Sequence, residues 1–241
     1  AAEYNPFEFV KTNILGTQNV VTAALSVNVE KVLSLSTDKA CSPINLYGAT
    51  KLAADKIMIS ANNIKGKKKT VFSVVRYGNV MGSRGSVLEV FKKYKDKGYF
   101  PITDNNMTRF NISLSEAVQF VKDSLKYMMG GELFVPKLKS FKITDLAKAV
   151  NPRNKFKIIG IRPGEKVHEE LISFSESQAT YELKNSYIIL PDLTYSHWKL
   201  KDFKKRYKKF NPQKSREKFS YNSFDNKEKI FLKDLKKVIN T

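Results

Sequence analysis

The chain has 241 residues, of which 41% are hydrophobic and 12% aromatic, and this composition is typical of a globular protein and excludes a largely disordered one. It carries 43 Lys and Arg against 23 Asp and Glu, a formal net charge of +20. A single cysteine, Cys41, excludes an internal disulfide framework and a cysteine-based zinc site. We therefore predict one large domain or two small ones, no metal site, and a reducing cytoplasm as the location.

The positive charge raises the question of a nucleic-acid partner. Only seven of the basic residues are Arg, whereas base readout and bidentate phosphate contacts favour Arg over Lys. We therefore expect a solvated, lysine-rich surface and no nucleic-acid partner. The sequence also has no run of about 18 apolar residues, so no membrane-spanning helix is predicted.

Helical and extended patterns alternate along the chain, which predicts an α/β fold. Asn5-Pro6 is typical of a helix start, because Asn can cap free amides and Pro is preorganised at the first helical position. Ser113 and Glu116 form a capping-box sequence at a later start. We predict helices from Asn5 to about residue 25, then over 47–64, 87–97, 113–128 and 227–239, and a further helix carrying His168, Glu169 and Leu171; strands are predicted over 32–37, 70–77 and 155–161, with short extended pieces in 99–112.

One segment, 35–51, contains most of the residues that could take part in a chemical reaction. Ser36, Thr37, Asp38 and Lys39 follow an apolar run, so we expect their side chains at the carboxyl edge of a sheet, where open α/β sheets bind ligands. Tyr47 and Lys51 are four residues apart in a predicted helix. This spacing places the phenol and the ammonium on one face, where the positive charge favours the phenolate.

These residues resemble a known family. Ser36-Thr37 followed by Tyr47-x-x-x-Lys51 resembles the catalytic segment of the extended short-chain dehydrogenases/reductases that act on nucleotide sugars. Asp38-Lys39 narrows the resemblance to the inverting UDP-N-acetylglucosamine 4,6-dehydratases. The similarity extends from about Glu3 to about Leu190, through Asn5-Pro-Phe-Glu, Thr12-Asn-Ile-Leu-Gly-Thr, Arg76-Tyr-Gly-Asn-Val-Met-Gly-Ser-Arg-Gly-Ser and Ile161-Arg-Pro-Gly-Glu-Lys.

The resemblance implies a role for each catalytic residue. Tyr47, held as phenolate by Lys51, would take the proton of the sugar C4 hydroxyl while bound NADP takes the hydride, and Thr37 would hydrogen-bond that hydroxyl. Lys39 would then remove the C5 proton as a base, and Asp38 would protonate the departing C6 hydroxyl as an acid. Reprotonation of C5 from the opposite face would invert that centre.

Further residues are assigned to ligand binding by the same resemblance. Asn13 would help to order Tyr47 and Lys51 at the cofactor; the alternative is an exposed polar residue of a helix. An anionic nucleotide sugar would suit a basic cleft, and for Arg109 a plain surface arginine is an equal alternative. The expected substrate-binding residues are Asn79, Arg84, Arg109, Arg162 and Glu165.

The resemblance also implies an architecture. We expect a partial Rossmann-like, doubly wound parallel sheet whose first strand-helix units are missing, with a smaller C-terminal substrate-binding α/β region. We assign 1–98 to the NADP-binding domain with the catalytic motif, 99–191 mainly to substrate binding, and 192–241 to a basic C-terminal extension. Roughly 80 to 100 residues with the glycine-rich cofactor fingerprint would precede Ala1. We therefore expect these 241 residues alone to be poorly stable and to bind NADP weakly, and the complete protein to be a homo-oligomer.

Several alternatives compete with the dehydratase interpretation. A nucleotide-sugar 4-epimerase needs Thr37, Tyr47 and Lys51 but no acid/base pair, so Asp38-Lys39 argues against it. Retaining dTDP-glucose-type dehydratases have Asp-Glu in place of that pair, and membrane-anchored retaining UDP-N-acetylglucosamine dehydratases have Met in place of Tyr47. From a different class, the chain could be a non-catalytic binding module. In the simplest alternative, Asp38 and Lys39 are only a loop ion pair and Tyr47 is a buried phenol.

Overall fold

The computed structural model describes residues 2–83, 85–192, 199–216 and 218–239. The chain divides into two compact units that alternate along the sequence. Unit 1 comprises Ala1–Tyr77, Val118–Lys137 and Leu171–Ser220, and unit 2 comprises Gly78–Ala117, Leu138–Glu170 and Tyr221–Thr241. The functional division predicted at residues 98 and 191 concerns ligand binding and stays a prediction.

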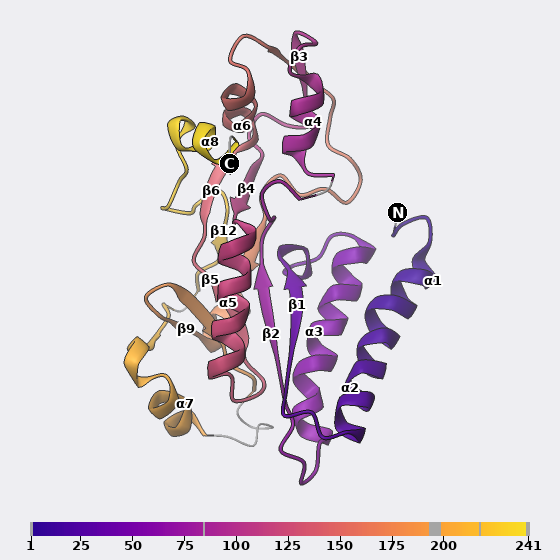
Figure 1. Ribbon diagram of the computed structural model, residues 1–241, viewed down its shortest axis with the longest axis vertical. Coiled ribbons are helices and arrows are strands. Elements are labelled where there is room, and N and C mark those ends of the chain that lie inside the picture. Colours follow the sequence, from indigo (N-terminus) through magenta and orange to yellow (C-terminus); the bar gives the residue numbers. More distant parts are fainter. Residues whose placement is uncertain (1, 84, 193–198, 217, 240–241) are drawn as a thin grey trace. The chain divides into compact units, whose positions relative to one another are not determined.

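Unit 1 is built on one six-stranded sheet with the order β1-β2-β5-β10-β9-β11 (Figure 1). The half that contains β1, β2 and β5 is parallel, and the other half is antiparallel. The register of β1 on β2 places Ser36 opposite Arg76 and Thr37 opposite Tyr77. The α/β prediction and its first two strands are thus confirmed. The bounds are β1 (Lys31–Thr37), β2 (Val71–Tyr77), β5 (Leu133–Pro136), β9 (Thr180–Glu182), β10 (Ser186–Ile189) and β11 (Gln213–Lys214).

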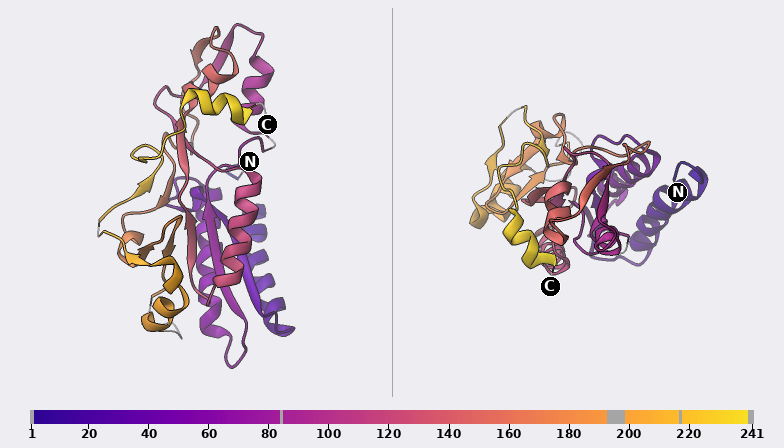
Figure 2. Two further views of the ribbon diagram at one scale, coloured as in Figure 1. Left: turned by 60° about the vertical axis from the view of Figure 1, so that its left-hand side comes forward. Right: turned by 90° about the horizontal axis from the view of Figure 1, so that it is seen from above.

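Helices cover both faces of the parallel strands in unit 1. Two of them, α2 and α3, pack together on one face of β1 and β2, and α5 lies on the other face (Figures 1 and 2). On that second face Val75 joins an aromatic cluster with Phe134, Phe203 and Tyr207. The bounds are α1 (Pro6–Phe9), α2 (Gly16–Ser26), α3 (Leu46–Ile64), α5 (Leu114–Tyr127) and α7 (Leu200–Arg206), with short 3-10 turns at Asp38–Ala40, Glu176–Ala179 and Lys208–Phe210.

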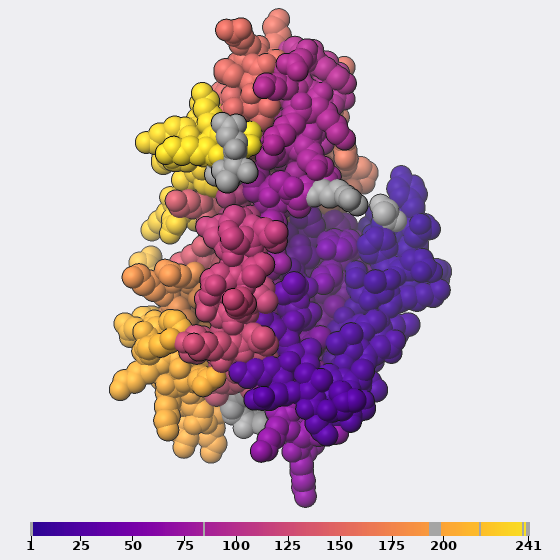
Figure 3. Space-filling view, viewed as in Figure 1, coloured from indigo at the N-terminus to yellow at the C-terminus, as the bar shows by residue number. Residues whose placement is uncertain are grey.

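The first predicted helix is continuous but not uniform. A π-helical turn, Val10–Leu15, connects α1 with α2. The surface of this N-terminal helical stretch lies within the indigo part of Figure 3. Pro6 stands at the first helical position as expected, whereas the side chain of Asn5 makes no capping hydrogen bond. The predicted capping box is present at α5, because Ser113 N donates to Glu116 Oε2 and Glu116 N donates to Ser113 Oγ.

Unit 2 has a separate core between short strands and three helices. Strands β3 and β7 are parallel, and β4 and β6 are antiparallel. Phe91, Phe100 and Leu146 are fully buried there, and Leu235 of the last helix packs against the same cluster. The bounds are α4 (Val87–Tyr94), β3 (Tyr99–Ile102), β4 (Thr108–Asn111), β6 (Lys139–Lys142), α6 (Ile143–Val150), β7 (Lys155–Ile158), β12 (Tyr221–Asn222) and α8 (Leu232–Ile239). Strand β8 (Glu170–Ile172) begins at the last residue of one unit 2 segment and continues into unit 1.

Two expectations about the later part of the chain are wrong. The helix predicted to carry His168, Glu169 and Leu171 is absent, and β8 occupies part of that segment. The helix does not form because carbonyl groups of this segment are bonded outside it: Val167 O accepts from Thr108 N, and Glu169 O accepts from Ser223 N. The helix predicted over 227–239 begins only at Leu232, because residues 228–230 hydrogen-bond to Ser140 of β6.

The described ranges lack two features. None of their helices combines the length and the apolar character that a bilayer crossing requires. The same residues contain no group of three or more His, Cys, Asp and Glu side chains that could hold a metal ion.

Candidate active site

The loop that follows β1 gathers three of the predicted catalytic residues. Thr37 Oγ1 donates a hydrogen bond to Asp38 Oδ1 over 2.9 Å, and Lys39 Nζ contacts the same oxygen at 3.0 Å. Asp38 is 1% exposed, and its second oxygen, Oδ2, is buried with no hydrogen-bond partner among the described residues. Asp38 and Lys39 therefore form an ion pair, as one alternative expected. The second carboxylate oxygen of Asp38 remains without a partner among the described residues, and a ligand hydroxyl could donate a hydrogen bond to it.

The other two catalytic candidates are held by α3. Asn45 caps this helix by accepting a hydrogen bond from Gly48 N, and the helix places Tyr47 and Lys51 one turn apart. Lys51 Nζ donates to Leu35 O over 2.9 Å and so ties the helix to the end of β1. The Tyr47 ring packs edge-on against Phe9, and its hydroxyl has no hydrogen-bond partner within the described part of the chain. Tyr47 is half-buried, so part of its side chain is accessible to solvent.

Asn13 contacts this helix between the two catalytic positions. It lies in the π-helical turn, a feature that is frequent at functional sites. Its side-chain amide donates to Thr50 Oγ1 over 3.0 Å, and Thr50 Oγ1 donates to Tyr47 O. Asn13 thus binds the turn that carries Tyr47 and Lys51 rather than their side chains. Its role toward a cofactor stays a prediction.

A buried network beneath the loop was not found from the sequence. Asp55 continues the helical spacing of Tyr47 and Lys51 by one more turn, and it is 1% exposed. Its Oδ2 accepts a hydrogen bond from Ser36 Oγ at 2.7 Å and lies 3.5 Å from Arg76 Nη2. Burial raises the pKa of Asp55, while the positive charges of Arg76 and Lys51 oppose that rise.

The same arginine connects to the far end of the loop. Arg76 Nη1 donates to both carboxylate oxygens of Glu176 at 3.0 Å, and the Cys41 thiol donates to Glu176 Oε2. Burial would raise the pKa of Glu176, but Arg76 and hydrogen bonds from Ser173 hold it below its usual value. The network therefore binds Ser36 before the loop that carries Asp38 and Lys39, and Cys41 after it. The only signal in the sequence was the position of Asp55 one turn after Lys51.

The predicted substrate-binding residues belong to unit 2. Arg109 is buried, and its guanidinium lies 3.7 Å from Glu165 and 3.7 Å from Glu169. It also donates to the backbone oxygens of residues 108, 166 and 167, so it anchors this segment. Asn79 and Arg162 are exposed. Arg84 lies outside the described residues. The structure thus brings Arg109 and Glu165 together, and the substrate roles stay predictions.

Comparison with known proteins adds to this geometry. A family model described as "Polysaccharide biosynthesis protein" matches residues 1–191. The chain belongs to this family.

The relatives agree with that assignment. A Campylobacter jejuni protein named UDP-N-acetylglucosamine 4,6-dehydratase (inverting) is 52% identical over 241 residues, which is 99% of this chain and 72% of the relative. A UDP-glucose 4-epimerase of Rickettsia bellii is 43% identical over 195 residues, 79% of this chain and 57% of its own length. The X-ray structure of Pen from Bacillus thuringiensis superposes with a TM-score of 0.85 at 37% identity, covering 99% of this chain and 71% of the other.

In this member of the polysaccharide biosynthesis family, Gly48 allows the loop after β1 to lie against α3. A Cβ atom at this position would collide with the carbonyl oxygen of Lys39 and would lie 3.0 Å from Pro43 Cβ. Both obstacles belong to the loop, and the nearer one is backbone. Only glycine therefore permits this approach.

We expect Gly48→Ala to lower the free energy of unfolding by about 1–3 kcal/mol, because the added methyl group forces the Lys39 backbone away from the helix. Urea unfolding measures this change. Gly16→Ala is the matched control: Gly16 is also helical, and its added Cβ would meet Lys11 O at an ordinary 3.5 Å, so that variant should be unchanged or more stable by up to about 1 kcal/mol. Equal stability changes in the two variants would contradict the steric explanation.

Proposed function

We propose that the protein is a UDP-N-acetylglucosamine 4,6-dehydratase that inverts C5 and forms a UDP-2-acetamido-2,6-dideoxy-4-keto-hexose, for the synthesis of pseudaminic acid or a related surface glycan. The observation that carries the proposal is the Asp38–Lys39 pair beside Thr37 at the carboxyl end of β1, with Lys51 bonded to the same strand. The 52% identity to the Campylobacter jejuni dehydratase supports it. Use of NADP, a homo-oligomer and a cytoplasmic location are part of the proposal.

The residues at this edge fit a nicotinamide cofactor. The carboxyl ends of parallel strands are the usual ligand edge of such sheets, and the Tyr47 hydroxyl there has no partner among the residues described. Tyr47 and Lys51 would hold the cofactor, with Asn13 supporting their helix. When bound, the cofactor supplies a hydride acceptor for C4 and later a hydride donor for C6.

The protein's own residues supply the first proton transfer. Removing hydride from C4 requires that the C4 hydroxyl lose its proton, and Tyr47 as phenolate accepts that proton. The Lys51 ammonium, one helical turn away, stabilises the phenolate electrostatically. Thr37 orients the same hydroxyl by hydrogen bonding. The resulting C4 ketone acidifies the C5 proton.

The ion pair supplies the acid and the base of the elimination. Transfer of one proton from Lys39 Nζ to Asp38 Oδ1, across their 3.0 Å contact, gives a neutral amine and a carboxylic acid. Lys39 then removes the C5 proton, and Asp38 protonates the C6 hydroxyl, which leaves as water. Reprotonation of C5 on the opposite face completes the inversion.

The substrate's diphosphate and sugar are assigned to unit 2 by the same proposal. Arg162 is exposed at the turn before Glu165, so its guanidinium can reach a phosphate. Arg109, already bonded to Glu165 and Glu169, fixes the segment that carries this turn. Asn79 and Arg84 complete the proposed set.

The test is to incubate the full-length protein with UDP-N-acetylglucosamine and NADP in D₂O and to follow the sugar by mass spectrometry and NMR. We expect loss of one water, a C4 ketone, and deuterium at an inverted C5. Lys39→Met, which removes the base, should abolish dehydration. A product that retains all its oxygens but has an inverted C4 would instead support a 4-epimerase, the activity named for the Rickettsia bellii relative. No turnover by the wild-type protein would contradict both.

A further inference from the structure

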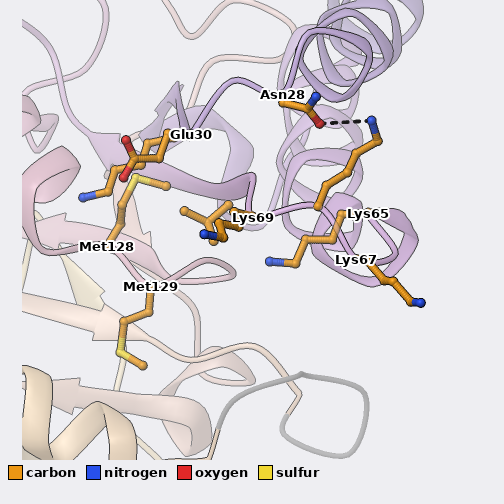
Figure 4. Close-up of a pocket in the computed structure, with 10 residues that line it drawn as sticks. Asn28, Glu30, Lys65, Lys67, Lys69, Met128 and Met129 are labelled. Atoms are coloured by element: carbon orange, nitrogen blue, oxygen red, sulfur yellow. Dashed lines mark hydrogen bonds between the residues drawn. The ribbon is translucent and has the colours of Figure 1, made fainter.

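Unit 1 has a cavity at the opposite end of its parallel strands from the catalytic loop. Its volume is about 1010 Å³, and we call it the amino-edge pocket (Figure 4). Lys31 and Val71, the first residues of β1 and β2, line it, whereas Thr37 ends β1 at the other edge. Five lysines line this pocket against a single carboxylate, Glu30.

Two of these lysines, Lys31 and Lys68, hydrogen-bond to backbone carbonyl groups. Lys31 Nζ donates to Leu125 O and Lys126 O at the end of α5, and Lys68 Nζ donates to Leu25 O at the end of α2. Each thus satisfies carbonyl groups at a helix C-terminus, where positive charge is favourable. The ammonium groups of Lys31 and Lys68 are therefore already bound to carbonyl groups of the protein.

Lys65 and Lys69 differ from that pair. Neither ammonium forms a hydrogen bond or an ion pair with any residue that the structure describes. Figure 4 shows the Lys65 ammonium directed toward Lys69, while the Lys67 ammonium points the opposite way. Burial lowers the pKa of Lys65, so its charge is partly desolvated without a compensating anion. Two ammonium groups that line one pocket without an anionic partner among the described residues are suited to a phosphate or diphosphate.

The rest of the lining suits a larger molecule than phosphate. Met128, which is 2% exposed, and Met129 form an apolar wall, and thioethers make favourable contacts with aromatic rings. The Glu30 carboxylate also has no partner among the described side chains, and in Figure 4 it lies beside Met128, across the pocket from Lys65. A carboxylate of this kind can accept hydrogen bonds from a ribose diol.

We propose that the amino-edge pocket binds a nucleoside diphosphate, with the phosphates between Lys65 and Lys69, the ribose hydroxyls at Glu30 and the base against Met128 and Met129. This site is separate from the catalytic loop and does not depend on the proposed reaction. It places a second nucleotide on unit 1, at the edge of the sheet that the chemistry does not use.

The experiment is calorimetric titration of the full-length protein with ADP, in the presence of saturating UDP-N-acetylglucosamine and NADP so that the catalytic edge is occupied. The double variant Lys65→Ala/Lys69→Ala should bind ADP at least about tenfold more weakly, because it loses two charge-assisted hydrogen bonds. Lys92→Ala, which removes an equivalent charge from the exposed surface of α4 in unit 2, should change the affinity less than about twofold. Thermal unfolding of the variants checks their folding.

Two further arms identify what the pocket recognises. Inorganic pyrophosphate should bind more weakly than ADP but with the same dependence on Lys65 and Lys69, and Met128→Ala should weaken ADP binding more than pyrophosphate binding. ADP binding that is undetectable, that is unaffected by Lys65→Ala/Lys69→Ala, or that falls equally with Lys92→Ala would overturn the proposal.

Discussion

Tyr47→Phe is expected to reduce the kcat of the proposed dehydration by about 10²–10⁴-fold, the range for loss of a positioned general base. The variant removes one oxygen atom, and that hydroxyl has no hydrogen-bond partner among the described residues. The ring packing against Phe9 remains, so the fold should be unaffected. Steady-state kinetics with UDP-N-acetylglucosamine, together with a thermal melt, separates the chemical effect from a structural one.

The choice of Tyr47 rather than Lys51 makes this test specific. Lys51→Met would also lose the hydrogen bond to Leu35 O, so it changes the contact between α3 and β1 as well as the electrostatics of the site. Tyr4→Phe is the matched control, because Tyr4 is 88% exposed and lies just before α1, the helix that carries Phe9. It should keep wild-type kcat and KM. A Tyr47→Phe enzyme with a kcat within threefold of the wild type, on the scale of these effects, would show that the phenol is not the base.

The parts of the fold that local patterns determine were predictable. Strand β1, strand β2 and helix α3 each follow from a run of apolar residues or from helical spacing within a few residues of the predicted bounds. The position of Thr37, Asp38 and Lys39 at the end of β1 follows from the same pattern, because side chains that come directly after a buried parallel strand emerge at its carboxyl edge.

The parts that depend on distant partners were not predictable. Residues 167–169 do not form a helix because Thr108 and Ser223 hydrogen-bond to their carbonyl groups, and neither partner is near them in sequence. Helix α8 begins late for the same kind of reason, since Ser140 pairs with residues 228–230. A helical pattern read from one segment cannot show that its amides and carbonyls are already bonded elsewhere.

The network around Arg76 is the clearest example of this limit. It joins Asp55 in α3, Arg76 in β2 and Glu176 in a 3-10 turn 100 residues further along the chain. Nothing in the local sequence around Glu176 indicates a partner for the arginine. Yet the network binds Ser36 and Cys41 on the two sides of the loop after β1. It therefore helps to determine the positions of Thr37, Asp38 and Lys39, which were predictable from the sequence.

Arg76→Met is expected to lower the free energy of unfolding by about 3–5 kcal/mol, the cost of removing one partner from a buried ion pair. Arg76 is 1% exposed, and without it Asp55 and Glu176 remain in the core with their charges uncompensated. Chemical denaturation followed by circular dichroism measures the loss. The control is Lys11→Met, which breaks the Lys11–Glu8 pair at the surface, where both side chains are more than 60% exposed. That change should cost less than about 1 kcal/mol.

A rescue variant separates uncompensated charge from lost packing. Asp55→Asn and Glu176→Gln added to Arg76→Met remove both carboxylate charges and retain groups that can accept from Ser36 and Ser173. If the cost of Arg76→Met is electrostatic, this triple variant should recover more than half of the lost stability. A triple variant as unstable as Arg76→Met would assign the loss to packing instead. The amides of this variant can still accept hydrogen bonds from Ser36 and Ser173. Recovered stability should therefore bring back part of the activity. That result would link the geometry of the loop after β1 to the charge balance of the network beneath it.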